Sequence, residues 1–206
     1  GYLDDPEVND YLNELGNRLV AVAADRFDFE FFAVPDPGIN AFALPGGFIG
    51  VNTGLVLLAQ SESELASVLA HEITHVTQRH YTRSLAGQQR SLLYSLAALA
   101  VAVAASRSGS SSAGQATSAA IASSQALAIQ TQLNYTREHE YEADRIGYQR
   151  LVSAGFDPNS MAVFMDRLQK SGRFSDSNAP SYLRSHPITY ERVAEAMALN
   201  GYLGEL

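Results

Sequence analysis

The sequence predicts an α+β fold that is mostly helical. Apolar residues recur at steps of three and four along most of the chain, whereas strand-like alternation is confined to residues 27–52. The chain has 206 residues, of which 46% are hydrophobic and 17% charged, enough to bury a core. A single domain over residues 1–206 is therefore expected.

The first elements are an amphipathic helix over residues 6–24 and an aromatic-rich strand over 27–34. Two short extended pieces follow at residues 40–44 and 48–52, joined by a bend at Pro45-Gly46-Gly47. Because proline donates no backbone hydrogen bond, it disfavours a central strand. We therefore expect these two pieces at a sheet edge.

A helix begins after Ser61, whose side chain is expected to accept a hydrogen bond from the backbone of Glu64 in a capping box, and runs to about Tyr81. Ser, Gly and Ala dominate residues 106–124, which predicts a mobile loop. Further helices are expected over about 122–154, ending at Gly155, and over 158–171 and 187–199, with a polar loop over 172–181.

Charge and composition exclude several classes of protein. The net charge of −8 argues against a basic nucleic-acid-binding surface and against attraction to anionic lipid by overall charge. The absence of Cys excludes disulfides and thiolate zinc sites. No basic-then-apolar leader opens the sequence, and the most apolar run, Ser91 to Ala105, is shorter than the roughly 20 residues of a membrane-spanning helix. Neither a signal peptide nor a transmembrane segment is expected within it.

The sequence His71-Glu72-Ile73-Thr74-His75 matches the HExxH pattern on a predicted helix. Two His four positions apart lie on one helix face, so both imidazoles can reach one metal ion. Zinc suits imidazole and carboxylate ligands. Glu72 would lie near the same opening, where it could take a proton from an attacking water.

A third metal ligand is expected within residues 137–144, where three Glu and one Asp occur. Glu138 and Glu142 share one helix face, and Glu140 and Asp144 share the opposite one. Spacing alone does not choose between the pairs, and an acidic solvated face is the alternative. Glu140 with Asp144 is the more economical choice, since one carboxylate could bind the metal while the other orients a ligand His.

Four segments stand out along the chain: NAFALPGGFIGVNTGL (40–55), LASVLAHEITHVTQRH (65–80), REHEYEADRIG (137–147) and SHPITYER (185–192). Together they resemble the HtpX / CAAX-prenyl-protease-like zinc metallopeptidase family (peptidase family M forty-eight), closest to its periplasmic BepA-like (YfgC-like) branch. The resemblance covers roughly Phe29 to Ala198. It implies a gluzincin-type metallopeptidase domain with a small sheet whose edge strand flanks the HExxH helix.

The resemblance also implies roles for the residues of the pattern. His71, His75 and Glu140 are expected to bind one zinc ion, with Glu72 as the general base. The E-x-x-x-D spacing of the family selects Glu140 over its two neighbouring Glu. Asp144 is then expected to orient a ligand His from behind.

His186 and Arg192 match the His-Pro…Arg element of the family and are expected to contact the substrate carbonyl and the developing oxyanion. In the BepA-like branch the His can instead cap the zinc and hold the enzyme latent, and the bland alternative is a helix-start residue. His80 and His139 are not expected to be ligands, because each points away from the ligand positions on its helix. Arg79 and Arg83 are expected at the surface.

An extended polypeptide could pair with a free sheet edge beside the HExxH helix. The expected substrate-binding residues are Asn40, Ala41, Phe42, Ala43, Phe48, Ile49 and Gly50.

The expected function is zinc-dependent endopeptidase hydrolysis of misfolded or unassembled envelope proteins, in the periplasm by resemblance. A protease-like chaperone or binding module with a latent zinc site is the alternative. Residues 84–130 are expected to form a lid or plug, or a surface that touches a membrane or outer-membrane assembly machinery. A third hypothesis is a membrane-associated protease held through residues 91–105.

Overall fold

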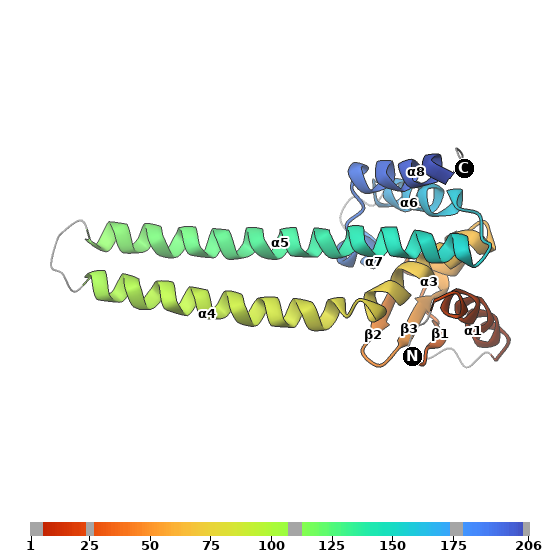
Figure 1. Ribbon diagram of the computed structural model, residues 1–206, viewed down its shortest axis with the longest axis horizontal. Coiled ribbons are helices and arrows are strands. Elements are labelled where there is room, and N and C mark those ends of the chain that lie inside the picture. The colour runs from red at the N-terminus through yellow and green to blue at the C-terminus, as the bar shows by residue number, and fades with distance from the viewer. Residues whose placement is uncertain (1–5, 24–26, 107–112, 174–178, 204–206) are drawn as a thin grey trace. The chain divides into compact units, whose positions relative to one another are not determined.

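The computed structural model describes residues 6–23, 27–106, 113–173 and 179–203 (Figure 1). Contacts divide the chain into two compact units: a first unit of Gly1–Gln78 with Glu140–Leu206, and a second unit of Arg79–His139. The single domain expected from the sequence stays a prediction, because compactness alone does not show whether the units fold separately.

The first unit combines helices with one small sheet, as the sequence predicts. Its elements in chain order are α1 (Pro6–Ala21), β1 (Glu30–Val34), β2 (Ala41–Leu44), β3 (Phe48–Asn52), α2 (Thr53–Leu58), α3 (Glu62–Thr77), the C-terminal part of α5 (Ala113–Ser153), α6 (Asn159–Arg173), α7 (Ser181–Ser185) and α8 (Tyr190–Leu203).

The sheet has the strand order β1-β3-β2. β1 pairs with β3 in parallel and β2 pairs with β3 antiparallel, so that Ile49 lies between Phe31 and Ala43. The prediction of a sheet edge is therefore right for β2 and wrong for β3, whose two sides are both occupied by strands. β2 packs against α3, which confirms that an edge strand flanks the HExxH helix.

One face of the sheet forms the core with α1 and α3. Because strand side chains alternate, one set of alternate positions points to these helices. Fully burying such an aliphatic or aromatic side chain stabilises the fold by about 1.5–3 kcal/mol. The set comprises Phe31, Ala33, Ala41, Ile49 and Val51 from the sheet, Leu12, Leu15 and Leu19 from α1, and Leu65, Leu69 and Ile73 from α3.

Helix α3 is fixed at its start by the predicted cap. The Ser61 hydroxyl accepts a hydrogen bond from the backbone N–H of Glu64 at 3.2 Å. The Glu64 carboxylate accepts one from the backbone N–H of Gln60 at 2.7 Å, instead of from that of Ser61 as a capping box predicts. The helix ends at Thr77 instead of about Tyr81, because Arg79 takes a left-handed φ of 54° that interrupts it.

The second unit is built from α4 (His80–Ser106) and the N-terminal part of α5. The predicted loop over 106–124 is wrong for Ser106, the last residue of α4, and for residues 113–124, which belong to α5. Alanine is the strongest helix former, and the alanines of this stretch outweigh its Ser and Gly. Residues 107–112 lie outside the described part. No helix in the described ranges is both long and apolar enough to cross a membrane.

The C-terminal helices follow the prediction with one addition. α5 ends just before Gly155, whose φ of 80° suits a glycine that terminates a helix. α6 and α8 match two of the predicted helices, although α8 begins three residues later than expected. The short helix α7 was not predicted, because its residues fall between a polar loop and the His186-Pro187 pair.

Close packing of α5 on α3 depends on Gly147. A Cβ at this position would lie 3.2 Å from the backbone of Ala70 and His71, tighter than most such contacts. We expect Gly147→Ala to lower the free energy of unfolding by about 1–3 kcal/mol relative to a control alanine, and to weaken metal binding by displacing α5. Chemical denaturation and chelator competition measure the two effects.

The matched control is Gly201→Ala, because its added Cβ would meet no atom within 4 Å. This substitution is expected to be neutral or slightly stabilising. Equal unfolding free energies for the two variants would show that the α3–α5 approach is not tight.

Candidate metal centre

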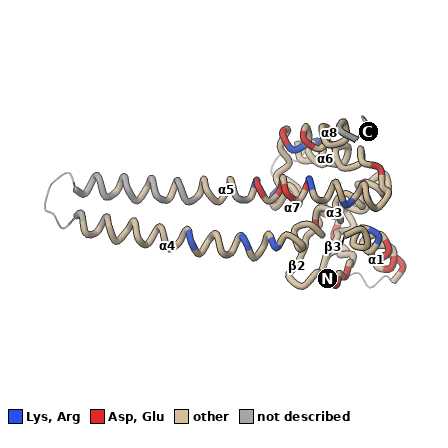
Figure 2. Tube along the Cα trace, viewed as in Figure 1, with Lys and Arg blue, Asp and Glu red and all other residues tan. Residues whose placement is uncertain are grey.

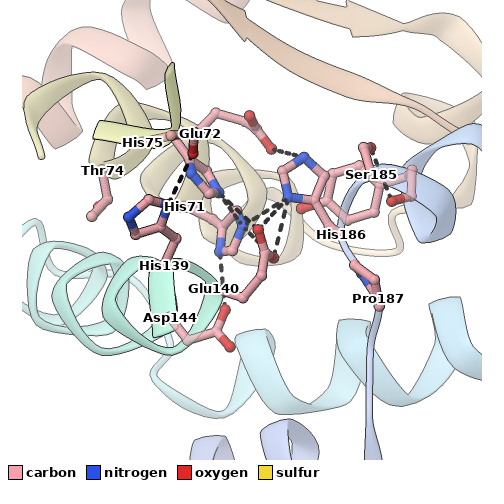
Figure 3. A network of polar contacts seen from close by, with 12 residues as sticks. His71, Glu72, Thr74, His75, His139, Glu140, Asp144, Ser185, His186 and Pro187 are labelled. Atoms are coloured by element: carbon pink, nitrogen blue, oxygen red, sulfur yellow. Dashed lines mark hydrogen bonds and ion pairs between the residues drawn. The ribbon is translucent and has the colours of Figure 1, made fainter. Parts of the chain in front are cut away.

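Helix α3 presents two histidines side by side in the interior of the first unit (Figure 3). His71 is buried and His75 is partly buried, and their Nε2 atoms lie 2.9 Å apart. The four-residue spacing predicted this, since residues four apart occupy the same helix face. Two ring nitrogens thus point at one place.

Helix α5 brings a carboxylate to the same place. The Glu140 oxygens lie 3.4 Å from Nε2 of His71 and 3.4 Å from Nε2 of His75. Glu140 is buried, whereas Glu138 is exposed and Glu142 half-buried. Of the pairs that spacing left open, the structure brings Glu140 to the histidines.

His186, which follows α7, completes the cluster. Its Nδ1 lies 3.1 and 3.2 Å from the Glu140 oxygens and 3.3 Å from Nε2 of His71. His71, His75, Glu140 and His186 each offer one ligand atom, and these atoms all lie within 4.8 Å of one another. Three imidazoles and one carboxylate in a buried space are a donor set that fits a transition-metal ion such as zinc.

Asp144 supports the cluster from one helical turn beyond Glu140. Its Oδ1 accepts a hydrogen bond from Nδ1 of His71 at 2.9 Å, so Nε2 of that ring faces the cluster. The predicted role of Asp144 in orienting a histidine agrees with this geometry.

Arg192 holds the two carboxylates together from behind. Its Nε and Nη2 donate to Asp144 at 2.6 and 2.8 Å, and its Nη1 donates to Glu140 and to the Pro187 carbonyl, both at 2.9 Å. The side chain is buried. The guanidinium thus binds two carboxylates, and the expected contact of Arg192 with a substrate oxyanion stays a prediction.

The buried charges compensate one another. Burial raises the pKa of Glu140, but its contacts with His186 and His71 outweigh burial and hold that pKa well below its usual range. Burial also raises the pKa of Asp144, and the hydrogen bonds from His71 and Arg192 bring it below normal. For His71, burial lowers the pKa, while Asp144 and Glu140 together raise it to about 10. Both carboxylates are therefore anionic near neutral pH.

Glu72 lies beside the cluster without joining it. Its side chain is 1% exposed, and its Oε1 lies 3.5 Å from Nε2 of His186. This oxygen makes no hydrogen bond within the part of the chain that the structure describes. A buried carboxylate oxygen without a hydrogen bond is costly, which indicates a functional position.

Sequence reasoning missed Tyr182. Its ring lies 4.6 Å from that of His186, centroid to centroid, and burial raises its pKa well above normal. Its backbone N–H donates to the Ile39 carbonyl next to β2, and its carbonyl accepts from the His186 N–H. The four-residue step from Tyr182 to His186 was the only signal in the sequence.

Two further histidines lie in the second unit. The rings of His80 and His139 stack with centroids 4.2 Å apart, and both are buried. Neither belongs to the four-residue cluster. Arg79 and Arg83 are exposed, as expected.

The expected substrate-binding residues divide between two strands. Ala41, Phe42 and Ala43 lie in the edge strand β2, with Asn40 just before it. Phe48, Ile49 and Gly50 lie in β3, which pairs with β1 on one side and β2 on the other. The prediction that Phe48, Ile49 and Gly50 form a peptide-pairing edge is wrong, because both sides of β3 already pair with strands.

We expect Asp144→Asn to weaken metal binding by about 10- to 100-fold. The substitution removes the carboxylate that accepts a hydrogen bond from His71 and that forms the main ion pair of Arg192. Competition with a chromogenic chelator measures the affinity. Asp166→Asn is the matched control, since Asp166 pairs with Lys170 at the surface. An affinity unchanged by Asp144→Asn would remove Asp144 from the site.

Comparison with known proteins agrees with this geometry. The model of "Peptidase family M48" matches residues 4–200. The chain is 39% identical over 196 residues to the beta-barrel assembly-enhancing protease of Escherichia coli K12, and 46% identical over 195 residues to a Vibrio cholerae protein given that name provisionally. Each alignment covers 94% of this chain and 39% of the relative.

A more distant relative is the mitochondrial metalloendopeptidase OMA1 of Schizosaccharomyces pombe, 29% identical over 185 residues, or 89% of this chain and 50% of the relative. The chain thus spans about two fifths of the length of the two bacterial relatives. The family match covers nearly all of this chain and includes every residue of the cluster. The chain therefore belongs to peptidase family M48.

Proposed function

We propose that this chain is the catalytic domain of a zinc-dependent endopeptidase. The observation that carries the proposal is the meeting of His71, His75 and Glu140 beside Glu72. Relatives named as proteases and metalloendopeptidases support it. These relatives extend well beyond the aligned region, so the activity of the whole protein is part of the proposal.

His71, His75 and Glu140 would hold the zinc ion, which when bound supplies a Lewis acid that polarises the peptide carbonyl and activates water. His71 and Glu140 are buried and His75 is partly buried, which limits the access of competing solvent to the ligand atoms. Asp144 fixes the His71 ring, and Arg192 fixes both Asp144 and Glu140. We assign Asp144 and Arg192 as positioning residues.

Glu72 is the general base of the proposed reaction. Its Oε1 would accept a proton from the attacking water and later give that proton to the leaving amine. The lack of a hydrogen bond to this oxygen within the described residues suits a group that must exchange protons. A purely structural metal site would have no use for this carboxylate, which disfavours the alternative of a binding module with a latent zinc site.

His186 acts as a gate in this proposal. Its Nδ1 lies among the ligand atoms, and its Nε2 lies 3.5 Å from Glu72. A histidine in this position would occupy the place that the substrate carbonyl and the water need. It must move before catalysis, after which it could stabilise the oxyanion as the sequence resemblance implies.

The substrate in this proposal is an extended polypeptide that pairs with the edge strand β2. β2 packs against α3, the helix that carries His71 and Glu72. Pairing there would bring a scissile bond to the ligand cluster. The name of the bacterial relatives refers to a protease that enhances beta-barrel assembly, which supports contact with such assembly machinery. Envelope proteins as substrates and the periplasm as the compartment are further parts of this proposal. The lid over residues 84–130 stays a prediction.

We expect Glu72→Gln to lower the rate of peptide cleavage by about 10²- to 10⁴-fold, while zinc content and the unfolding transition stay unchanged. The amide keeps the shape of the side chain but cannot accept the proton. Cleavage of unfolded outer-membrane protein fragments, followed by mass spectrometry, measures the rate.

Glu62→Gln is the matched control, because Glu62 lies in the same helix but pairs with Arg18 at the surface. Its cleavage rate should equal that of the unaltered chain. Full activity in Glu72→Gln would contradict the proposed mechanism, and binding without cleavage in the unaltered, zinc-loaded chain would support the binding module instead.

A further inference from the structure

Helix α4 of the second unit exposes many large apolar side chains. Leu92, Leu96, Leu99 and Val103 are exposed at steps of four, three and four, so they follow one side of the helix. Leu96, Leu99 and Val103 also line a shallow groove together with Ala100 and Ala104. Exposed apolar patches of this kind mark interaction sites.

The exposed apolar side chains are not limited to that side. Leu93, Tyr94 and Val101 are 65%, 74% and 70% exposed and lie on other sides of α4. Ile129 and Leu133 of α5 are exposed as well. The apolar surface therefore extends around the helix, unlike the single stripe of an amphipathic helix that packs on a core.

Small residues occupy the half-buried positions of α4. These positions recur at steps of three and four and are Ser84, Gly87, Ser91, Ser95 and Ala98. Ser84 lies 3.5 Å from Nδ1 of His139 in α5, so this line of small residues faces α5.

In a helix pair that is stable in water, large apolar residues lie between the helices. The second unit shows the reverse, with small and hydroxyl-bearing residues between its helices and Leu and Val on the outside. Small residues between helices and large apolar ones outside are typical of helices in contact with lipid.

The charge of the second unit also differs from that of the rest. Residues 79–139 contain five Arg and one Glu, a net charge of +4, whereas the other residues contain 9 basic and 21 acidic side chains, a net charge of −12. Along α4, Figure 2 shows basic positions and no acidic one. The overall charge of −8 conceals this separation, so the expectation that charge opposes contact with anionic lipid holds only outside the second unit.

We propose that the second unit adsorbs to a lipid surface that carries anionic headgroups, with residues 92–103 of α4 entering the interface. Arg83 and Arg90 would then lie near the headgroups, where basic side chains gain attraction to anionic lipid. Twelve helical residues span about 18 Å, less than the roughly 30 Å of a bilayer core, so the unit enters one leaflet and does not cross.

A lipid surface explains the observations better than a second copy of the chain. A coiled-coil partner would cover the Leu92–Val103 side but leave Leu93 and Val101 in water. Lipid can cover every apolar side at once. In a dimer, the second units of the two copies would also repel each other, since each has a net charge of +4.

A tryptophan probe tests the proposal, because the chain has no natural Trp. Tyr94→Trp places one on α4, and Tyr190→Trp places a control at a similarly exposed position of α8. With vesicles of phosphatidylcholine and phosphatidylglycerol, we expect a blue-shifted emission, quenched by brominated lipid, for Tyr94→Trp and no change for Tyr190→Trp. This readout needs no peptidase activity, so it is independent of the proposed function.

Further variants in the Tyr94→Trp background distinguish the contribution of charge to vesicle binding from that of apolar contact. The double change Leu96→Glu with Leu99→Glu should weaken vesicle binding at least about tenfold, whereas Leu57→Glu, at an exposed leucine of α2, should not. Arg90→Glu should weaken binding to anionic vesicles about fivefold or more, whereas Arg145→Glu should not. Raised salt should act in the same direction as Arg90→Glu.

Two results would overturn the proposal. One is an emission of Tyr94→Trp that does not change at any fraction of anionic lipid. The other is an emission already blue-shifted without vesicles, together with a doubled mass in light scattering, which would assign the apolar surface to a second copy of the chain.

Discussion

The close approach of α5 to α3 is the constraint on which the site depends. Two candidate ligands of the cluster come from α3 and a third from α5, and their atoms meet only if the helix backbones nearly touch at Gly147. The packing that positions Glu140 also brings Asp144 to His71. A side chain at position 147 would push Glu140 and Asp144 away from the histidines together. The packing of α5 on α3 and the geometry of the metal cluster therefore depend on the same contact.

Burial then makes each polar contact of the site matter more. Glu140, Asp144, His71 and Arg192 are almost fully buried, and each charge is met by an opposite one. In such surroundings an uncompensated charge is expensive, so removing one partner disturbs the others. Glu72 differs, since its Oε1 lies 3.5 Å from Nε2 of His186 but lacks a hydrogen bond among the described residues, which supports a role in proton transfer.

The sequence alone predicted the parts of the site that lie close together in the chain. His71 and His75 share a helix face by spacing, but Glu140 lies 65 residues after His75, and choosing it among three Glu needed the resemblance to a family. The central place of β3 was not predictable, because strand order depends on where β1 pairs. The helix over 113–124 was missed because Ser and Gly suggested a loop, whereas the alanine content favours a helix. The helix α7 was missed because Pro and polar residues suggested a loop, whereas tertiary contacts stabilise a short helix there.

The central claim is that His71, His75 and Glu140 hold one zinc ion. Metal analysis by plasma mass spectrometry on the unaltered chain, Glu140→Ala and Glu138→Ala tests it most directly. The account predicts about one zinc per chain, unchanged in Glu138→Ala, whose side chain is exposed, and lost or sharply reduced in Glu140→Ala. No zinc after careful loading, or equal zinc in both variants, would contradict the claim.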